Sequence, residues 1–148
     1  MLHYLTRYLI EQDTQFTVLV VNQVSGKTFN RAKLFNIGFT HQTQKANGQD
    51  ECFVFHDVDF IAENSNFVYY CDEKHPLHLS AWLHEENYVP FYKMFMGGVT
   101  SFTKEQFTSI NGYSNETDLQ VQKAKNLTFY SRVISIHKIR VLGMGSRR

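Results

Sequence analysis

Three segments within the first 60 residues restrict the possible folds of this chain more than its other features do. Residues 16–21 (Phe-Thr-Val-Leu-Val-Val) are almost continuously apolar and rich in β-branched side chains, which is typical of a strand covered on both faces. Residues 30–38 form a predicted helix with Gly38 as its C-terminal cap, and residues 51–60 form a second predicted strand. Strand, helix and strand in this order predict an α/β fold with a right-handed parallel crossover.

The rest of the chain adds a few elements to a single predicted domain. The first dozen residues have the spacing of an amphipathic helix, with Leu2, Leu5 and Leu9 on one apolar stripe. Residues 103–106 (Thr-Lys-Glu-Gln) fit a capping box that opens a short helix ending at Gly112. The remaining predictions are loop for residues 40–50, loop for most of residues 61–93, and one or two strands within residues 127–142.

Composition narrows the class of protein. The chain has 148 residues, of which 43% are hydrophobic, so it can bury a core and is not intrinsically disordered. Its formal net charge of +1 gives no electrostatic argument for binding nucleic acid. No apolar run approaches the roughly 18–20 residues that cross a bilayer, so no membrane span is expected in this chain.

Two features bear on the cellular compartment and leave it open. Cys52 and Cys71 are the only cysteines, and an even number permits one disulfide without requiring it. Asn115 and Asn126 each begin an N-glycosylation acceptor pattern, Asn-Glu-Thr and Asn-Leu-Thr. Because such patterns also arise by chance in cytosolic chains, the residues alone favour neither setting.

Asp57 and Asp59 form the first candidate site, at the end of the second predicted strand. Side chains two residues apart on a strand share a face, and ligands of open α/β sheets collect at the carboxyl ends of strands. Two carboxylates there can hold a divalent cation, which in turn can neutralise a pyrophosphate leaving group. The alternative is a turn with solvated acids, and the short D-x-D pattern alone favours that alternative.

Basic residues open the predicted helix that begins at Asn30. Helix N-termini favour anions, and Arg31 and Lys33 add positive charge to this one. The guanidinium of Arg31 offers a forked donor for phosphate or a plane on which a base can stack. The alternative is a solvated first turn, but acids are the usual choice at this end of a helix, so the basic residues favour an anion site slightly.

Histidines supply two further metal hypotheses. His137 lies in the last predicted strand and suits a first-row transition metal, but spacing alone favours a histidine at the edge of the core, because it has no partner nearby in the sequence. A zinc site is the other hypothesis, and the paired C-x2-C arm typical of zinc fingers is missing from it. Its ligands would come from Cys71, His75, His78 and His84.

Three blocks of the sequence resemble the β-1,4-galactosyltransferase family in order and spacing. They are residues 29–39 (FNRAKLFNIGF), residues 52–59 (CFVFHDVD), and residues 97–107 with 110–115 (GGVTSFTKEQF and INGYSN). The resemblance implies the GT-A fold, a Rossmann-like mixed sheet with flanking helices, here incomplete. It also implies that residues 1–148 are one partial catalytic domain, with a nucleotide-binding half (1–93) and an acceptor and metal half (94–148).

The resemblance further implies an activity and a compartment. Members transfer galactose from UDP-galactose to a terminal N-acetylglucosamine of a glycan, with inversion and with manganese (Mn²⁺) as cofactor, and some relatives use UDP-GalNAc. They work in the Golgi lumen, so a type II membrane anchor is expected in a full-length protein. The family pairs one cysteine just before its D-V-D strand with another shortly after it, which implies a Cys52–Cys71 disulfide and a lumenal setting.

Site residues carry over from the family position by position. Phe29, Asn30 and Arg31 are expected to contact the uridine nucleotide. Asp57, Val58 and Asp59 are expected to line the nucleotide-sugar site. Asp59 and His137 are expected to ligate the metal, and Gly97 and Gly98 to form the wall near the donor sugar and acceptor.

This sequence also departs from the family. It has no P-[FY]-R-[ND]-R strand before residue 1, and after Asn115 it lacks the W-G-W-G-G-E-D-D-D segment that carries acceptor contacts and the general base, with Asp118 as a possible remnant. Ile134 replaces a methionine near the metal site, and residues 82–86 have no match for a donor-site lysine. A weak or inactive transferase is therefore expected, with a non-catalytic UDP-sugar or glycan-binding relative as the alternative. The missing first strand predicts an exposed sheet edge and poor solubility.

Overall fold

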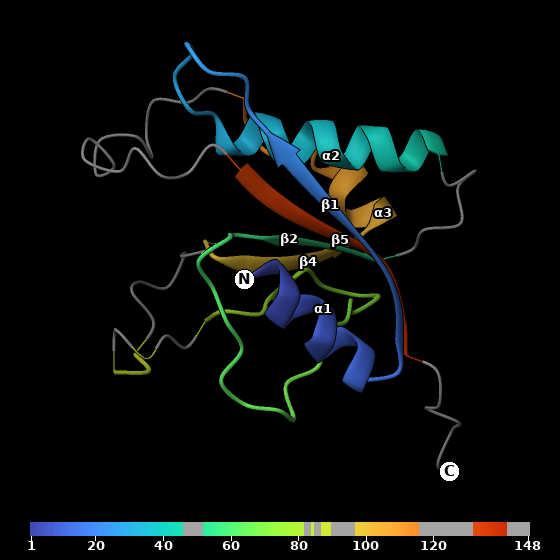
Figure 1. The fold of residues 1–148 in the computed structure, drawn as a ribbon. Helices are drawn as coiled ribbons and strands as arrows, with labels where there is room; N and C mark the ends of the chain where they lie inside the picture. Colours follow the sequence, from blue (N-terminus) through green and yellow to red (C-terminus); the bar gives the residue numbers. More distant parts are fainter. Residues whose placement is uncertain (46–51, 82–83, 85–86, 90–96, 116–131, 142–148) are drawn as a thin grey trace.

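A computed structural model describes residues 1–45, 52–81, 84, 87–89, 97–115 and 132–141 (Figure 1). Two helices, α1 (Leu2–Glu11) and α2 (Arg31–Lys45), alternate with strands β1 (Thr14–Asn22) and β2 (Cys52–His56). The later elements are β3 (Leu77–His78), β4 (Val99–Thr103), α3 (Lys104–Ser109) and β5 (Arg132–Val141). In the described part of the chain, no helix has both the length and the hydropathy needed to cross a membrane.

The strands form one open sheet in the order β1-β5-β2-β4-β3, and every neighbouring pair is antiparallel. The α/β class is confirmed, but the described sheet is antiparallel instead of the parallel sheet that the sequence predicts. Both strands are antiparallel to β5 and therefore run in the same direction, with β5 between them (Figure 1). A strand from the far end of the chain fills that place, which the local pattern of β1 and β2 does not reveal.

The strand that is covered on both faces is β2, whereas β1 lies at an edge of the sheet. Phe53, Val54 and Phe55 are 0% exposed. None of the side chains described within β1 is fully buried, and Val20 is 40% exposed. The prediction that residues 16–21 are covered on both faces is therefore wrong, because at this edge of the sheet the packed layers leave the described side chains of β1 partly exposed.

Two hydrophobic clusters lie on opposite faces of β2. On one face Phe53 and Phe55 pack with α2 and α3, through Leu34, Phe35 and Phe107. On the other face Cys52 and Val54 pack with α1 and with Tyr69 of the segment that follows β2. Helices therefore flank both sides of the sheet, as Figure 1 shows.

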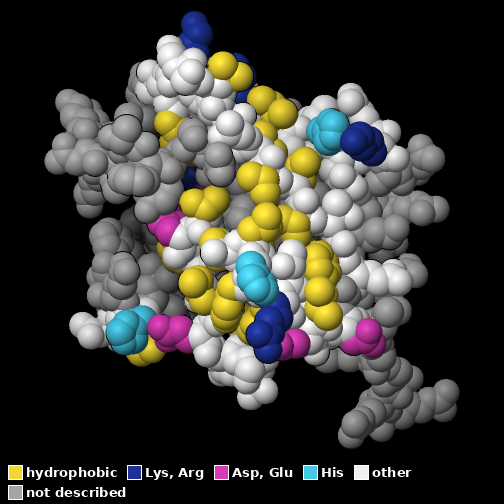
Figure 2. All heavy atoms as spheres, viewed as in Figure 1, with side chains coloured by type: hydrophobic (Ala, Val, Ile, Leu, Met, Phe, Trp, Pro, Cys, Tyr) yellow, Lys and Arg dark blue, Asp and Glu magenta, His cyan; other side chains and the backbone are white. Residues whose placement is uncertain are grey.

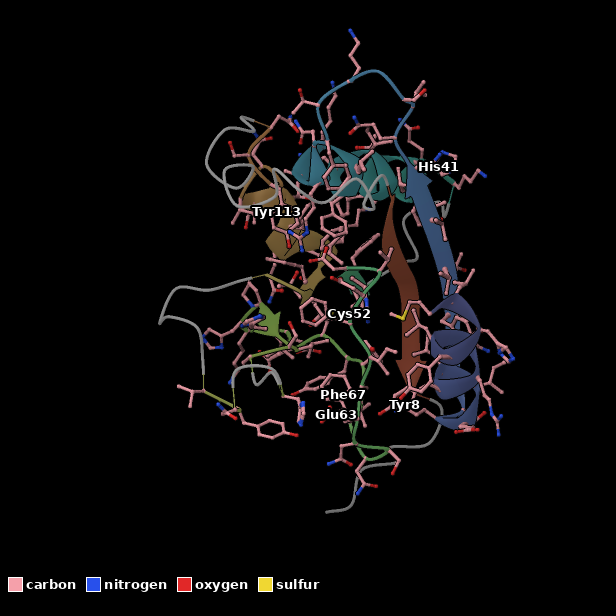
Figure 3. All side chains as sticks on the ribbon, turned by 60° about the vertical axis from the view of Figure 1, so that its left-hand side comes forward. Tyr8, His41, Cys52, Glu63, Phe67 and Tyr113 are labelled. Carbon is pink, nitrogen blue, oxygen red and sulfur yellow. A yellow bond between two sulfur atoms is a disulfide. The ribbon has the colours of Figure 1, made fainter. Side chains whose placement is uncertain are left out.

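Helix α1 confirms the first predicted helix, with one change in its buried stripe. Leu5 and Leu9 are buried, but Leu2 is 45% exposed and Tyr8 takes the third buried position. The Tyr8 hydroxyl lies 2.7 Å from the carbonyl oxygens of both Asn64 and Phe67, so α1 is fastened to the segment after β2 (Figure 3).

Helix α2 continues well past its predicted end. Gly38 is buried inside the helix instead of capping it, and residues 40–45 are helical instead of loop. The next residue, Phe39, packs against Phe53 and Phe107 with ring centroids 4.7 Å apart in each case. Tertiary packing of this ring outweighs the helix-terminating tendency of glycine.

The other boundaries agree with the sequence or shift by a few residues. The capping box at Thr103 and Gln106 is confirmed, and α3 ends at Ser109, three residues before Gly112. The second strand is shorter than predicted, since β2 ends at His56 and a turn follows. β5 confirms a strand within residues 127–142, of which 127–131 and 142 lie outside the described residues. In the described part of residues 61–93 the single strand is β3, which confirms the prediction that most of this segment is loop.

Hydrophobic side chains also gather on the surface over α1 and β1 (Figure 2). These two elements contribute the exposed side chains of Leu2, Tyr4, Ile10 and Val20. Poor solubility stays a prediction, and an exposed edge strand with apolar side chains is the feature that would cause it.

Replacing Phe55 tests whether β2 carries the core. Phe55→Ala is expected to lower the free energy of unfolding by about 3–5 kcal/mol, because it removes a ring that packs against Phe35, Phe102 and Phe107. Urea denaturation followed by circular dichroism measures the change. The control Ile37→Ala, at a residue that is 48% exposed, is expected to change stability by less than about 0.5 kcal/mol. Equal effects of the two substitutions would contradict the assignment of β2 as the centre of the core.

Candidate functional site

Asp57 is the first residue after β2 and is held by three different elements. Its N–H donates to the carbonyl oxygen of Gly98 at 3.0 Å, and its carbonyl oxygen lies 2.6 Å from Nδ1 of His56. Its carboxylate pairs with Nε of Arg31 at 2.5 Å. The two carboxylates of the D-V-D pattern therefore lie in a turn and not on one face of a strand, as the sequence interpretation assumed, although the turn is at the carboxyl end of β2 as predicted.

The Arg31–Asp57 pair is largely withdrawn from solvent. The two side chains are 19% and 24% exposed, and the guanidinium carbon of Arg31 lies 4.6 Å from the centre of the Phe35 ring. Burial raises the pKa of Asp57, and the nearby Arg31 charge opposes this rise. Nη2 of Arg31 is buried and, among the described residues, has no hydrogen-bond partner. The pair thus retains an unused donor that can serve an anionic ligand.

Asn30 caps helix α2 and links it to a distant part of the chain. Its Oδ1 accepts a hydrogen bond from the Lys33 N–H at 2.8 Å, and its Nδ2 donates to the carbonyl oxygen of Asn115 at 3.1 Å. Lys33 is exposed, as the solvated alternative expected. One N–H of the helix terminus is therefore used by its own cap. Arg31 is the basic side chain that faces the turn of residues 57–59, called the carboxylate turn below.

A second asparagine fixes the segment after α3 against the same helix. Asn36 donates to the Tyr113 carbonyl oxygen at 2.8 Å and to Oδ1 of Asn115 at 3.0 Å, and its own Oδ1 accepts from the Tyr113 N–H. The Tyr113 hydroxyl lies 2.7 Å from Oγ1 of the buried Thr100. Figure 3 shows Tyr113 beside the first turns of α2. Residues 30–36, Asp57, Gly98 and residues 113–115 therefore meet near the carboxyl end of β2.

Gly98 has a conformation that explains the glycine pair before β4. Its φ is +76°, and a Cβ atom there would collide with Oγ of Ser80. Ser80 and His78 both hydrogen-bond to the Gly97 carbonyl oxygen, at 3.0 and 2.8 Å. The glycines thus lie directly beside Asp57, and their role as a wall of the donor site stays a prediction.

The structure does not bring Asp59 and His137 together. His137 in β5 is opposite Phe53, near the start of β2, whereas Asp59 follows the end of that strand. Phe53 and Asp57 are four residues apart, which is about 13 Å along a strand. Asp59 is exposed, with no hydrogen bond or ion pair to another described residue. The backbone register separates the two residues along the sheet, their binding of one cation stays a prediction, and no chemical step below depends on a metal.

The other predicted residues occupy varied positions. Phe29 and Val58 are half-buried and pack against the clusters on opposite faces of β2. Asn115 is exposed, which a glycosylation acceptor requires, while Asp118 and Asn126 lie outside the described residues.

The two cysteines form a disulfide, with Cα atoms 5.5 Å apart. This confirms the pairing of Cys52 with Cys71 and removes the thiol that the zinc hypothesis needs. His78 is hydrogen-bonded to Gly97 and His75 lies near Asp72. Among the described residues no group of three potential ligands has the geometry of a metal site.

His56 is a residue that sequence reasoning missed. It is 0% exposed, and burial lowers its pKa to about 4. Its Nε2 lies 3.0 Å from the hydroxyl of Tyr69, which is also buried. A polar residue at the end of an otherwise apolar, buried run was the available signal, because such residues need buried partners.

Comparisons with known proteins match most of the chain. Residues 1–72 match the model described as the N-terminal region of glycosyl transferase group 7, and residues 77–118 match the N-terminal domain of galactosyltransferase. Over 115 residues, 78% of this chain, it is 40% identical to human (Homo sapiens) beta-1,4-galactosyltransferase 4 and 42% identical to Sus scrofa beta-1,4-galactosyltransferase 5. Those residues are 33% and 29% of the two relatives. A Lymnaea stagnalis beta-N-acetyl-D-glucosaminide beta-1,4-N-acetylglucosaminyl-transferase is 40% identical over 72% of this chain and 21% of its own length.

Burial of His56 predicts a pH dependence of stability. Its pKa is about 4 when folded and 6.5 when unfolded, so the unfolded chain binds more protons between these values. This contribution is present above pH 6.5 and is lost as the pH falls towards 4, by up to about 3 kcal/mol. Urea denaturation at several pH values measures it. His56→Gln is expected to flatten the dependence, whereas His75→Gln, at an exposed side chain, is expected to retain it. Identical pH profiles for the two variants would contradict the prediction.

Proposed function

We propose a function from one premise: this chain belongs to the β-1,4-galactosyltransferase family of group 7 glycosyltransferases. The chain spans about a third of the length of curated relatives such as the human one, so the activity of a whole protein is itself part of the proposal. We propose that the region around Asp57, at the carboxyl end of β2, binds the nucleotide of a UDP-sugar. The meeting of Arg31, Asp57 and Gly98 from three separate elements carries this proposal.

Arg31 is the proposed contact for the diphosphate. Its Nε is held by Asp57 and its plane by Phe35, which leaves the Nη side of the guanidinium for the ligand. A forked, always charged donor suits phosphate oxygens, and a fixed orientation lowers the entropy cost of binding. Asn30 and the half-buried Phe29 come directly before Arg31 and are the proposed contacts for uridine.

The donor sugar and the acceptor are proposed from the family. UDP-galactose is the proposed donor and a terminal N-acetylglucosamine of a glycan the proposed acceptor, with UDP-GalNAc as a second donor. The Lymnaea stagnalis relative is named for transfer of N-acetylglucosamine, so similar chains differ in the sugar that they transfer. The sugar therefore needs a direct comparison of donors.

Manganese stays a prediction of the family resemblance. When bound, such a cation supplies positive charge to the diphosphate leaving group. Asp59, which is exposed beside the proposed nucleotide site, and His137 of β5 are the proposed ligands. The finer GT-A architecture is likewise proposed for this small sheet with helices on both faces.

Weak or absent transfer is the second part of the proposal. An inverting transfer needs a base to take the proton of the acceptor hydroxyl, and such a group contributes typically 10²–10⁴-fold. The acidic segment that carries the base in the family is missing after Asn115. A protein that binds a UDP-sugar or a glycan without transferring sugar is the alternative, and this missing segment is the observation that favours it.

An oxidising compartment is proposed for the protein, because the Cys52–Cys71 disulfide is stable in the secretory pathway and rare in the cytosol. The Golgi lumen is the compartment that the family implies. Glycosylation at Asn115 and Asn126 is part of the same proposal.

Replacing Arg31 tests the nucleotide site. Arg31→Met is expected to weaken UDP binding at least about tenfold, because charged hydrogen bonds contribute about 1.5–3 kcal/mol. Calorimetric titration with UDP, with and without Mn²⁺, measures the affinity. The control Arg7→Met removes an arginine that is paired with Glu11 on the exposed side of α1 and is expected to leave the affinity unchanged. Wild-type affinity in Arg31→Met would contradict the proposed site.

A transfer assay separates the two candidate functions. Binding of UDP-galactose without formation of a disaccharide on N-acetylglucosamine is expected, with UDP-GalNAc and UDP-GlcNAc as parallel donors. Turnover at a rate typical of enzymes, about 1 s⁻¹ or more, would show that the missing acidic segment is not required.

A further inference from the structure

His56 and Tyr69 form a buried polar pair directly beneath the carboxylate turn. They are 0% and 2% exposed, and both come from the segment that the Cys52–Cys71 disulfide closes into a ring. The Tyr69 ring packs edge-on against Phe67, with ring centroids 5.1 Å apart, so its hydroxyl has a fixed direction. The proposed nucleotide contacts use neither side chain.

The two hydrogen bonds of His56 define one tautomer. Nδ1 lies 2.6 Å from the carbonyl oxygen of Asp57, which can only accept, so Nδ1 carries the hydrogen. Nε2 of the neutral ring is then an acceptor, and the Tyr69 hydroxyl donates to it at 3.0 Å. Both ring nitrogens are satisfied, and the tyrosine selects the tautomer that can hold the turn.

The hydrogen bond from His56 holds the carbonyl group of Asp57, the third polar group of this residue to be held. The N–H of Asp57 is bonded to Gly98 and its carboxylate to Arg31, while His56 holds the carbonyl group that begins the peptide bond to Val58. That peptide sets the direction of the turn and therefore the position of the exposed Asp59. The Phe60 N–H also donates to this carbonyl oxygen, but at 3.5 Å, so without the shorter His56 contact the carboxylate could keep its arginine while the turn rotated.

We propose that His56 and Tyr69 are positioning residues, which act through the Asp57 carbonyl to hold the carboxylate turn in the conformation that binds the nucleotide. The proposal rests on the proposed nucleotide site. A tyrosine and a histidine that merely fill the core would also need hydrogen-bond partners, so the conformation of the turn and the affinity for the nucleotide are the readouts that separate the two roles.

Tyr69→Phe is the decisive variant because it removes one hydroxyl and keeps the ring. Tyr8→Phe is its matched control, since the Tyr8 hydroxyl is also part-buried in the same layer but bonds to the carbonyl oxygens of Asn64 and Phe67 instead of to His56. Titration with UDP gives the affinity. ¹⁵N NMR of the imidazole rings gives the tautomer of His56, whose signals are assigned by their loss in His56→Asn.

Tyr69→Phe is expected to weaken UDP binding about fivefold to tenfold and to shift His56 away from the Nδ1–H tautomer, with changed amide shifts in residues 57–59. Tyr8→Phe is expected to change UDP affinity less than about twofold and to leave the tautomer intact. His56→Asn keeps a donor near the position of Nδ1 and is expected to bind UDP more tightly than His56→Leu. The order of these two variants is not expected from lost packing alone.

Two results would overturn the inference. One is an unchanged tautomer with unchanged amide shifts of residues 57–59 in Tyr69→Phe, and the other is an equal loss of UDP affinity in Tyr69→Phe and Tyr8→Phe. If the wild-type chain fails to bind UDP, the proposed function fails, but the tautomer and the amide shifts still decide whether the pair holds the turn.

Discussion

Burial of β2 on both faces is the constraint on which the rest of the structure depends. Alternate side chains of this strand enter two different clusters, Phe53 and Phe55 on one face and Cys52 and Val54 on the other. Each buried large apolar side chain contributes about 1.5–3 kcal/mol, and β2 is the described strand that joins both layers. Because the strand cannot slide without exposing one of its faces, the position of the turn that follows His56 is fixed by the core.

The ion pair between Arg31 and Asp57 follows from this arrangement. Phe35, one turn after Arg31, packs against Phe55 with ring centroids 5.1 Å apart, so the start of α2 lies beside the end of β2. Burial raises the pKa of Asp57, and without Arg31 a charged carboxylate there would be costly. The same packing that excludes water from the Asp57 carboxylate therefore requires a positive charge near the turn. The Arg31 guanidinium supplies that charge and is the proposed contact for the phosphates of a nucleotide.

Local signals could be predicted from the sequence, and contacts between distant segments could not. The capping box at Thr103, the apolar run of β2 and the helix that contains Leu5 depend on near neighbours, and each is confirmed. The insertion of β5 beside β2 depends on pairing between residues about 80 apart, for which the sequence of either strand has no marker. Gly38 was misjudged because Phe39 is anchored by rings from β2 and α3. The D-x-D pattern marks Asp57 and Asp59, and the family resemblance favours a function for them, whereas for His56, one residue earlier, the sequence predicts only a place in the strand.

Binding and transfer depend on different parts of this chain. The groups around Asp57 are preorganised in the free protein, and interactions made equally in ground and transition states give affinity without rate. The acceptor proton is removed only as the transition state forms, and this step needs a base. The acidic segment that carries the base in the family is missing after Asn115. On the proposed function, loss of that segment would lower the rate of transfer while the proposed donor contacts around Asp57 remain.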